Sequence, residues 1–334
     1  MDKELAAIAK VIEHGQFIDG PEVAEFEREV FGYTSGGYCV TCGNGTDALT
    51  LALMAFGIGP GDAVFVPAFT FVATAEAVVR VGATPVFTDV CSHTFLMRPE
   101  DLSEALLRLD PKLEARAVIP VDLFGHCPDY SGMHRIAVLN HMAVIADAAQ
   151  SFGSTQYCKA EQRDVKVGRL ADATATSFFP SKPLGCMGDG GAVITSNPYI
   201  ARRIGRLKCH GKGEEKYNSV DIGMNSRLDT IQAAVLLERL KTHDNHLEDR
   251  RSAAEIYRRS FSLQSTSEGN NPAWAQYTFK TLERDKVQAE LKADGMNTRV
   301  YYPVPVPKMP AYANYPCAPI PNSIEICEQV LSIV

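Results

Sequence analysis

Ser177-Phe178-Phe179-Pro180-Ser181-Lys182-Pro183-Leu184-Gly185 is the stretch of this 334-residue chain that constrains fold and chemistry most tightly. It places one lysine among apolar residues, between two prolines. Because proline fixes the backbone φ angle, the Lys182 amine is expected to be held in place. A lysine with a lowered pKa attacks carbonyl groups, and lysine anchors pyridoxal 5'-phosphate (PLP) in this way. The alternative is a surface lysine whose amine stays in water.

A carboxylate follows a second apolar run. Val144-Ile145-Ala146-Asp147-Ala148-Ala149-Gln150 predicts a short buried strand that ends at Asp147. In open α/β sheets, ligands bind at the carboxyl ends of strands. A carboxylate beside a pyridine nitrogen favours the protonated ring, which then accepts electrons. Asp147 is therefore a candidate partner of the PLP ring; the alternatives are a helix cap and a buried structural carboxylate.

A glycine turn supplies a candidate phosphate site. Gly43-Asn44-Gly45-Thr46-Asp47-Ala48-Leu49 follows an apolar run and opens a predicted helix over residues 47–56. Free backbone N–H groups at a helix N-terminus and the Thr46 hydroxyl suit a phosphate. Many such junctions only cap a helix. Phe71, after the predicted strand 63–66, could stack on a cofactor ring or belong to the core.

The pattern of apolar residues predicts an α/β fold. Helical patterns over 47–56, 73–81, 99–109 and 131–140 alternate with strand-like runs at 63–66, 84–87, 117–122, 144–147, 175–179 and 192–195. This alternation predicts a mainly parallel sheet with helices on both faces. A long helical pattern over 228–261 leads to a strand-helix-strand pattern over 276–302. We therefore expect a large α/β domain over 1–235 and a small α+β domain over 236–334.

Composition narrows the class of protein. The net charge of −7 disfavours nucleic acid as a partner. No segment is long and apolar enough to span a membrane, and no signal-peptide pattern begins the chain, so a cytoplasmic location is the default expectation. Nine cysteines, an odd number, favour reduced thiols. Cys39 and Cys42 form a C-x-x-C without a second pair at zinc spacing, so no metal site is expected.

The motifs quoted above are followed by a further one, Gly223-Met224-Asn225-Ser226-Arg227-Leu228-Asp229. In sequence and in order along the chain, this set resembles the motifs of the DegT/DnrJ/EryC1/StrS sugar aminotransferases. The resemblance runs from residues 14–18 to 300–303 and is greatest to the branch that aminates 3-keto UDP-sugar uronic acids (UDP-2-acetamido-2-deoxy-3-oxo-glucuronate). It implies a PLP-dependent, aspartate aminotransferase-like fold of type I. The implied reaction moves an amino group from L-glutamate to a nucleotide-linked keto sugar, in surface-polysaccharide synthesis such as that of lipopolysaccharide O-antigen.

The resemblance also implies a role for individual residues. Lys182 would bond to the cofactor and act as general base and acid. Asp147 would pair with the pyridine nitrogen, and Asn225 would reach the phosphate in the neighbouring subunit, which implies a homodimer with shared sites. The remaining cofactor contacts would be Gln150 at the ring hydroxyl, Phe71 at one ring face, and Ser177, Gly45 and Thr46 at the phosphate.

An anionic substrate requires local positive charge. A basic run supplies it: Arg202, Arg203, Arg206, Lys208, His210, Lys212 and Lys216. The alternative is a solvated helix face and loop. Our candidates for contacting the sugar nucleotide are His210, Tyr217, Arg227 and Tyr302.

Some features depart from the resemblance. Ala146 stands where the family usually has glutamate, and the chain ends at Val334, earlier than the family. Either the termini are not represented in this sequence or the small domain is trimmed. A regulatory or degenerate PLP-binding protein without transaminase activity is therefore the alternative function. Another PLP enzyme, such as a lyase or racemase, would use the same lysine. The family's dehydratases carry histidine at the position of Lys182 and are disfavoured.

Overall fold

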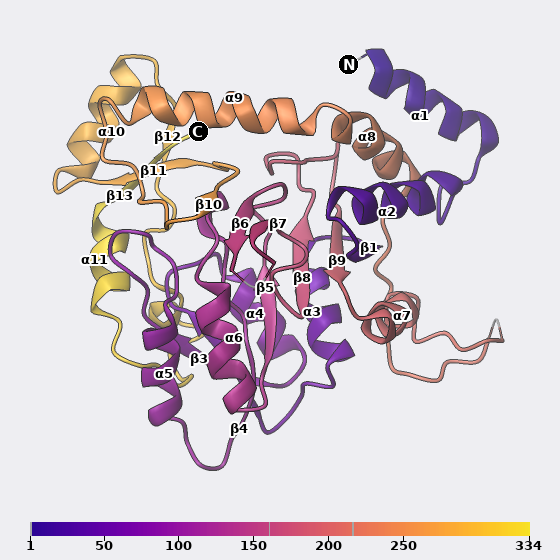
Figure 1. Ribbon diagram of the computed structural model, residues 1–334, viewed down its shortest axis with the longest axis horizontal. Helices are drawn as coiled ribbons and strands as arrows, with labels where there is room; N and C mark the ends of the chain where they lie inside the picture. The colour runs from indigo at the N-terminus through magenta and orange to yellow at the C-terminus, as the bar shows by residue number, and fades with distance from the viewer. Residues whose placement is uncertain (1, 160, 216) are drawn as a thin grey trace.

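The computed structural model describes residues 2–159, 161–215 and 217–334, and a seven-stranded sheet lies at its centre (Figure 1). The strands lie in the order β1-β9-β8-β5-β4-β2-β3. β9 pairs antiparallel with β1 and β8, and the other pairs are parallel. Their bounds are β1 (Tyr38–Cys42), β2 (Asp62–Pro67), β3 (Thr84–Thr88), β4 (Glu114–Val118), β5 (Ala143–Asp147), β8 (Ala173–Ser177) and β9 (Gly191–Thr195). The predicted mainly parallel sheet is confirmed.

Two predicted strands end elsewhere. β4 stops at Val118 rather than residue 122, because Pro120 has no N–H for the ladder. Pairing resumes there as a single bridge between Val121 and Asp147. β8 ends at Ser177 rather than residue 179, since the chain turns at Phe179 toward Lys182, whose N–H donates to the Phe179 carbonyl at 2.8 Å.

Helices cover both faces of the sheet because its strands alternate their side chains between two apolar clusters. Val64 and Val66 of β2 pack with α3 (Gly45–Ala55), while Phe65 packs on the opposite face with Leu102. The first face also carries α4 (Ala73–Arg80) and α7 (Pro198–Leu207). The opposite face carries α5 (Pro99–Leu107), α6 (Tyr130–Leu139), α2 (Pro21–Tyr33) and α8 (Thr230–Leu240). The predicted helices are thus present, with bounds shifted by a few residues.

The long helical pattern over 228–261 forms two helices rather than one. α8 ends at Leu240 and α9 (His243–Tyr257) follows after a break at Thr242, whose backbone is not helical. His243 fixes this break, since its buried ring lies 3.1 Å from the Phe152 carbonyl oxygen. α1 (Asp2–His14) lies beside α8, and α9 leads toward the C-terminal elements (Figure 1). Within the described ranges, no helix is long and apolar enough to cross a membrane.

Two small sheets complete the fold. One has the order β11-β13-β12, with β11 (Tyr277–Lys280), β12 (Thr298–Arg299) and the C-terminal strand β13 (Val330–Ile333) at its centre. α10 (Arg284–Ala293) and α11 (Pro321–Gln329) accompany it, and short 3₁₀ turns occur at Leu123–Gly125 and Val306–Lys308. The other sheet joins β6 (Thr155–Cys158), β7 (Arg163–Lys166) and β10 (Asn270–Asn271). The predicted strand-helix-strand pattern is confirmed, with β13 as an added strand.

Both outer strands of the large sheet have partners beyond the ladder. On β3, the Phe87 N–H donates to the Pro316 carbonyl at 2.9 Å, and the Ala318 N–H donates to the Phe87 carbonyl at 2.9 Å. On β1, the Thr41 N–H donates to Glu27 Oε1 at 2.8 Å, and Lys208 Nζ donates to the Thr41 carbonyl at 2.8 Å. Backbone groups thus pair with Phe87 at one edge, and two charged side chains pair with the backbone of Thr41 at the other.

Asp89 joins the large sheet to α11 and provides a stability prediction. Its carboxylate accepts hydrogen bonds from the backbone N–H groups of Asn322 and Ser323 at 3.0 and 2.8 Å and from the Ser323 hydroxyl at 2.6 Å. Asp89→Ala leaves these donors without an acceptor and should lower the free energy of unfolding by about 3 kcal/mol. Urea unfolding measures this, with Asp110→Ala in an exposed turn as the control, expected to change it by less than about 0.5 kcal/mol. Equal effects of the two substitutions would contradict the assignment.

Candidate active site

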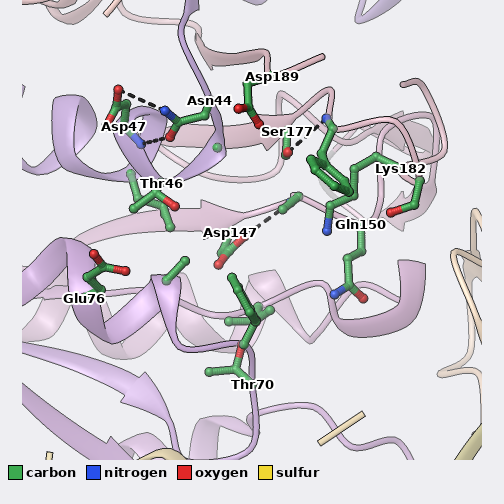
Figure 2. A pocket seen from close by; sticks show the side chains of 18 of the residues that line it. Asn44, Thr46, Asp47, Thr70, Glu76, Asp147, Gln150, Ser177, Lys182 and Asp189 are labelled. Atoms are coloured by element: carbon green, nitrogen blue, oxygen red, sulfur yellow. Dashed lines mark hydrogen bonds between the residues drawn. The ribbon is translucent and has the colours of Figure 1, made fainter. Parts of the chain in front are cut away.

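A cavity of about 620 Å³ opens where β1, β2, β5 and β8 end. These carboxyl ends meet at one side of the sheet, because β1 and β8 both pair antiparallel with β9 and the other strands are parallel to β8. Eight of the twelve predicted site residues line this cavity: Gly45, Thr46, Phe71, Asp147, Gln150, Ser177, Lys182 and Tyr302. Thr46, Asp147, Gln150, Ser177 and Lys182 are labelled in Figure 2. The topology thus gathers segments that lie far apart in the sequence.

Lys182 lies in the turn between β8 and β9, and its amine points into the space beside Asp147 and Gln150 (Figure 2). Among the residues that the structure describes, none forms a hydrogen bond or ion pair with this amine. Burial lowers the pKa of Lys182, and the opposing charge of Asp147 only partly offsets the shift. A neutral, unpaired amine is the form that attacks a carbonyl carbon.

Asp147 is the last residue of β5 and is buried. Thr74 Oγ1 donates to its Oδ2 at 2.7 Å, and the Ala149 N–H donates to its Oδ1 at 3.2 Å. Burial raises the pKa of Asp147, while these hydrogen bonds and the nearby Lys182 lower it. A cation placed against this carboxylate would favour its ionised form, as a pyridinium does. Ala146 points to the other face of the strand, into the apolar cluster beneath α6.

The phosphate cradle is built from the start of α3 and the end of β8. Asn44 caps the helix by accepting the Asp47 N–H at 2.8 Å, and the first N–H groups of a helix, here those of Gly45 and Thr46, have no acceptor within it. A Cβ at Gly45 would lie 2.8 Å from Ser177 Cβ, so only glycine leaves this space open. The N–H groups of Gly45 and Thr46 around this space are suited to bind the phosphate of PLP. The unpaired Lys182 amine is suited to react with the aldehyde of PLP.

Gly45→Ala tests this fit. The added methyl group should enter the cradle and weaken the affinity for PLP at least about tenfold, because one hydrogen bond to a charged group is worth that much. Titration of the purified protein with PLP, followed by visible absorbance, measures the change. Gly205→Ala in α7 is the matched control, since a Cβ there meets no atom within 4 Å. The same affinity in both variants would rule out Gly45 as part of the cradle.

Aromatic and amide groups complete the wall. Phe71 is 53% exposed, and its ring centroid lies 5.9 Å from that of Tyr302. Gln150 Oε1 accepts the Phe124 N–H at 2.6 Å, which orients the amide so that its Nε2 donates to Tyr302 Oη at 3.4 Å. Phe71 would cover one face of a flat cofactor ring whose nitrogen pairs with Asp147, and the Gln150 amide would meet the edge of that ring.

Four predicted residues do not line this chain's own cavity: Asn225, Arg227, His210 and Tyr217. Asn225 is exposed and forms a bridge with Cys209, and the His210 N–H donates to the Met224 carbonyl at 2.9 Å. Between these residues the chain makes an excursion that extends away from the body beyond α7 (Figure 1). Tyr217 on this excursion is 91% exposed, and Lys216 lies outside the described residues.

Other lining residues were not predicted from the sequence. Those with polar side chains are Asn44, Asp47, Thr70, Glu76, Arg80, Ser181, Asp189, Gln276 and Tyr301, and Thr74, which does not line the cavity, donates to Asp147. Thr70 and Thr74 lie four residues apart with hydroxyls 3.3 Å apart. That spacing across the start of α4 was a usable signal, since residues four apart lie on one face of a helix.

Comparisons with known proteins identify the family of this chain. The DegT/DnrJ/EryC1/StrS aminotransferase family matches residues 1–334. The UDP-2-acetamido-2-deoxy-3-oxo-D-glucuronate aminotransferase of Pseudomonas aeruginosa is 41% identical, over 99% of this chain and 90% of the relative. A pleiotropic regulatory protein of Geobacillus stearothermophilus is 35% identical, over 98% of this chain and 88% of the relative.

Solved structures extend the comparison. A DegT DnrJ EryC1 StrS aminotransferase from Brucella abortus superposes with a TM-score of 0.95 at 43% identity, over 99% of this chain and 90% of that one. NtdA from Bacillus subtilis, solved with bound cofactor PMP, gives a TM-score of 0.83 at 30% identity, over 99% and 76%. The predicted fold and the PLP cofactor are confirmed. The chain belongs to the DegT/DnrJ/EryC1/StrS aminotransferase family, which depends on PLP.

Proposed function

We propose that this protein transfers an amino group from L-glutamate to the keto carbon of a UDP-linked 3-keto uronic acid sugar, in surface-polysaccharide synthesis such as that of O-antigen. The observation that carries the proposal is the unpaired Lys182 amine in the cavity beside Asp147 and Gln150. The substrate is proposed from the 41% identity, over nearly the whole chain, to the Pseudomonas aeruginosa aminotransferase.

The residues of the cavity have separate tasks in this reaction. PLP, when bound, supplies the carbonyl that receives the amino group and the ring that accepts electrons. Lys182 Nζ takes the proton from the α-carbon of glutamate and, in the second half of the cycle, returns a proton to the sugar carbon. Asp147 holds the proton on the ring nitrogen, and Thr74 orients its carboxylate. Gly45, Thr46 and Ser177 hold the phosphate, and Phe71 covers a ring face.

The half-reactions can be tested separately. Purified protein with PLP should show a visible absorbance band that moves to shorter wavelength on adding L-glutamate, with release of 2-oxoglutarate. Adding the UDP-linked 3-keto uronic acid should restore the band and yield the 3-amino sugar by mass spectrometry. A band that glutamate does not change would contradict the donor, and a band that other keto-sugar nucleotides restore better would contradict the substrate.

A regulatory PLP-binding role is the second candidate, because a relative that matches 98% of this chain is a pleiotropic regulatory protein. Such a protein would bind PLP without turnover on any keto sugar. The same spectra decide between the two, since the regulatory role predicts a band that no keto-sugar nucleotide restores after glutamate.

We further propose a homodimer in which Asn225, His210, Tyr217 and Arg227 serve the neighbouring subunit's cavity. Asn225 would hold the cofactor phosphate, and the other three, with Tyr302, would contact the sugar nucleotide. The support is that these four residues lie outside this chain's own cavity, on or beside an excursion with exposed apolar residues such as Ile222, which is 92% exposed. The proposed division into domains over 1–235 and 236–334 places the whole excursion in the large domain.

Arg227 provides the kinetic prediction of this arrangement. Arg227→Ala should raise the KM for the UDP-sugar about tenfold or more and leave the KM for glutamate nearly unchanged, because only the sugar nucleotide carries the diphosphate. Steady-state kinetics of the complete reaction, with each substrate varied in turn, measure the two constants, with the exposed Arg259→Ala as a control. Equal changes in the two KM values would remove Arg227 from the sugar-nucleotide site.

A further inference from the structure

Asp47 lies in the cavity wall next to the cradle, and three side chains already donate hydrogen bonds to its carboxylate. Its Oδ2 accepts from Asn44 Nδ2 at 3.1 Å and from Ser226 Oγ at 2.8 Å. Its Oδ1 accepts from Arg80 at 3.4 Å. A carboxylate cannot serve as a ligand of an anionic phosphate. The function of Asp47 must therefore be exerted through the groups that it holds.

Ser226 is the most distant of these groups in sequence and is 2% exposed. Its Oγ donates to Asp47 and accepts the Gly43 N–H at 2.9 Å, so this one hydroxyl joins the end of β1 to the start of α3. Its own N–H donates to the Lys208 carbonyl at 2.9 Å. A shift of Ser226 would thus move both ends of the turn that forms the cradle.

Asn225 is the residue directly before Ser226, and it is exposed. The buried Ser226 side chain and the exposed Asn225 side chain belong to one extended segment, whose bridge to Cys209 holds Asn225 at the surface. The position of Asn225 therefore depends on the hydrogen bonds of Ser226. One short segment contacts the cradle of its own subunit and presents Asn225 to a neighbour.

We propose that Asp47 and Ser226 are positioning residues that couple the two cofactor sites of the dimer. Phosphate bound in one subunit's cradle orders the Gly43–Asp47 turn, and through Ser226 it fixes Asn225 for the partner's site. PLP binding at one site therefore raises the affinity of the other, and by linkage the effect is reciprocal. This inference rests on the proposed dimer in which Asn225 completes the neighbouring site.

Mixed dimers isolate the coupling from the local effect on the cradle. One subunit carries Lys182→Ala, so the visible band reports only the other, wild-type subunit. Adding Ser226→Ala to the Lys182→Ala subunit should weaken PLP binding at the wild-type site about tenfold or more, the effect of one hydrogen bond to a charged group. Ser103→Ala, which removes a hydroxyl hydrogen bond on α5, is the matched control and should leave the affinity unchanged.

Two further measurements separate positioning from damage to the fold. Ser226→Thr, which keeps the hydroxyl, should restore most of the affinity at the wild-type site. In the protein without PLP, Ser226→Ala should increase amide hydrogen exchange at Gly43 and residues 223–227 while the thermal midpoint stays within a few degrees. An unchanged affinity at the wild-type site, or an equal loss with Ser226→Thr and Ser226→Ala, would overturn the coupling.

The outcomes also distinguish this inference from the proposed function. If homodimers convert their band with glutamate but Ser226→Ala acts only on its own subunit, the coupling is wrong and the aminotransferase assignment stands. If Asn225→Ala in the Lys182→Ala subunit has no effect on the wild-type site, the shared site itself is wrong, and the coupling is overturned with it.

Discussion

Lys182→Ala should abolish the visible band with PLP and lower the rate of both half-reactions about 10⁴-fold or more. The loss is large because one amine both bonds to the cofactor and moves the proton, so no neighbouring group can replace it. Burial lowers the pKa of Lys182, so its charged form is disfavoured in the folded protein, and its removal should not lower the thermal midpoint without PLP. Rapid-mixing absorbance with glutamate measures the rate.

The control is Lys241→Ala, which removes an exposed lysine that pairs with Glu238 far from the cavity. It should leave the band and both rates unchanged. A Lys182→Ala protein that still forms the band and converts it at more than about a hundredth of the wild-type rate would require another nucleophile and would contradict the assigned role.

Asp147→Asn should lower kcat about 100- to 1000-fold while PLP still binds. The amide keeps the shape of the carboxylate but has no negative charge to hold a proton on the ring nitrogen. Removing one such electrostatic contact typically lowers kcat about 100- to 1000-fold. Burial raises the pKa of Asp147, so at neutral pH the ionised carboxylate destabilises the folded protein. Asp147→Asn should therefore match or exceed the wild-type thermal midpoint without PLP.

The matched control is Asp129→Asn at the N-terminus of α6. Asp129 accepts the Gly132 N–H at 2.9 Å, and asparagine caps a helix equally well, so activity and stability should not change. A kcat for Asp147→Asn within about threefold of the wild type would show that the ring nitrogen needs no carboxylate. A thermal midpoint well below that of the wild type would show that the carboxylate has a structural task instead.

The centre of the site could be predicted from sequence because its residues sit at the ends of recognisable elements. Asp147 ends an apolar strand, Gly45 opens a helix, and Lys182 lies between prolines, so local patterns identify each of them. The topology then brings them together, since parallel strands end on one side of a sheet. No local pattern shows that Thr74, 73 residues before Asp147, donates to its carboxylate.

Long-range contacts explain most of what the sequence did not predict. The Asp47–Ser226 hydrogen bond spans 179 residues, and the break at Thr242 depends on a carbonyl from Phe152. β13 lies between β11 and β12 although both precede it in the chain, which only tertiary pairing decides. The termination of β4 is different, because Pro120 alone accounts for it.

The contacts at the two edges of the large sheet affect the tendency of this protein to aggregate at high concentration. An unpaired outer strand is a template on which strands of other molecules can add, and this leads to aggregation. The segment 316–318 occupies that position beside β3, while Glu27 and Lys208 take up the free backbone groups of Thr41 on β1. The C-terminal part of the chain therefore helps to keep the sheet from growing between molecules, quite apart from any catalytic task.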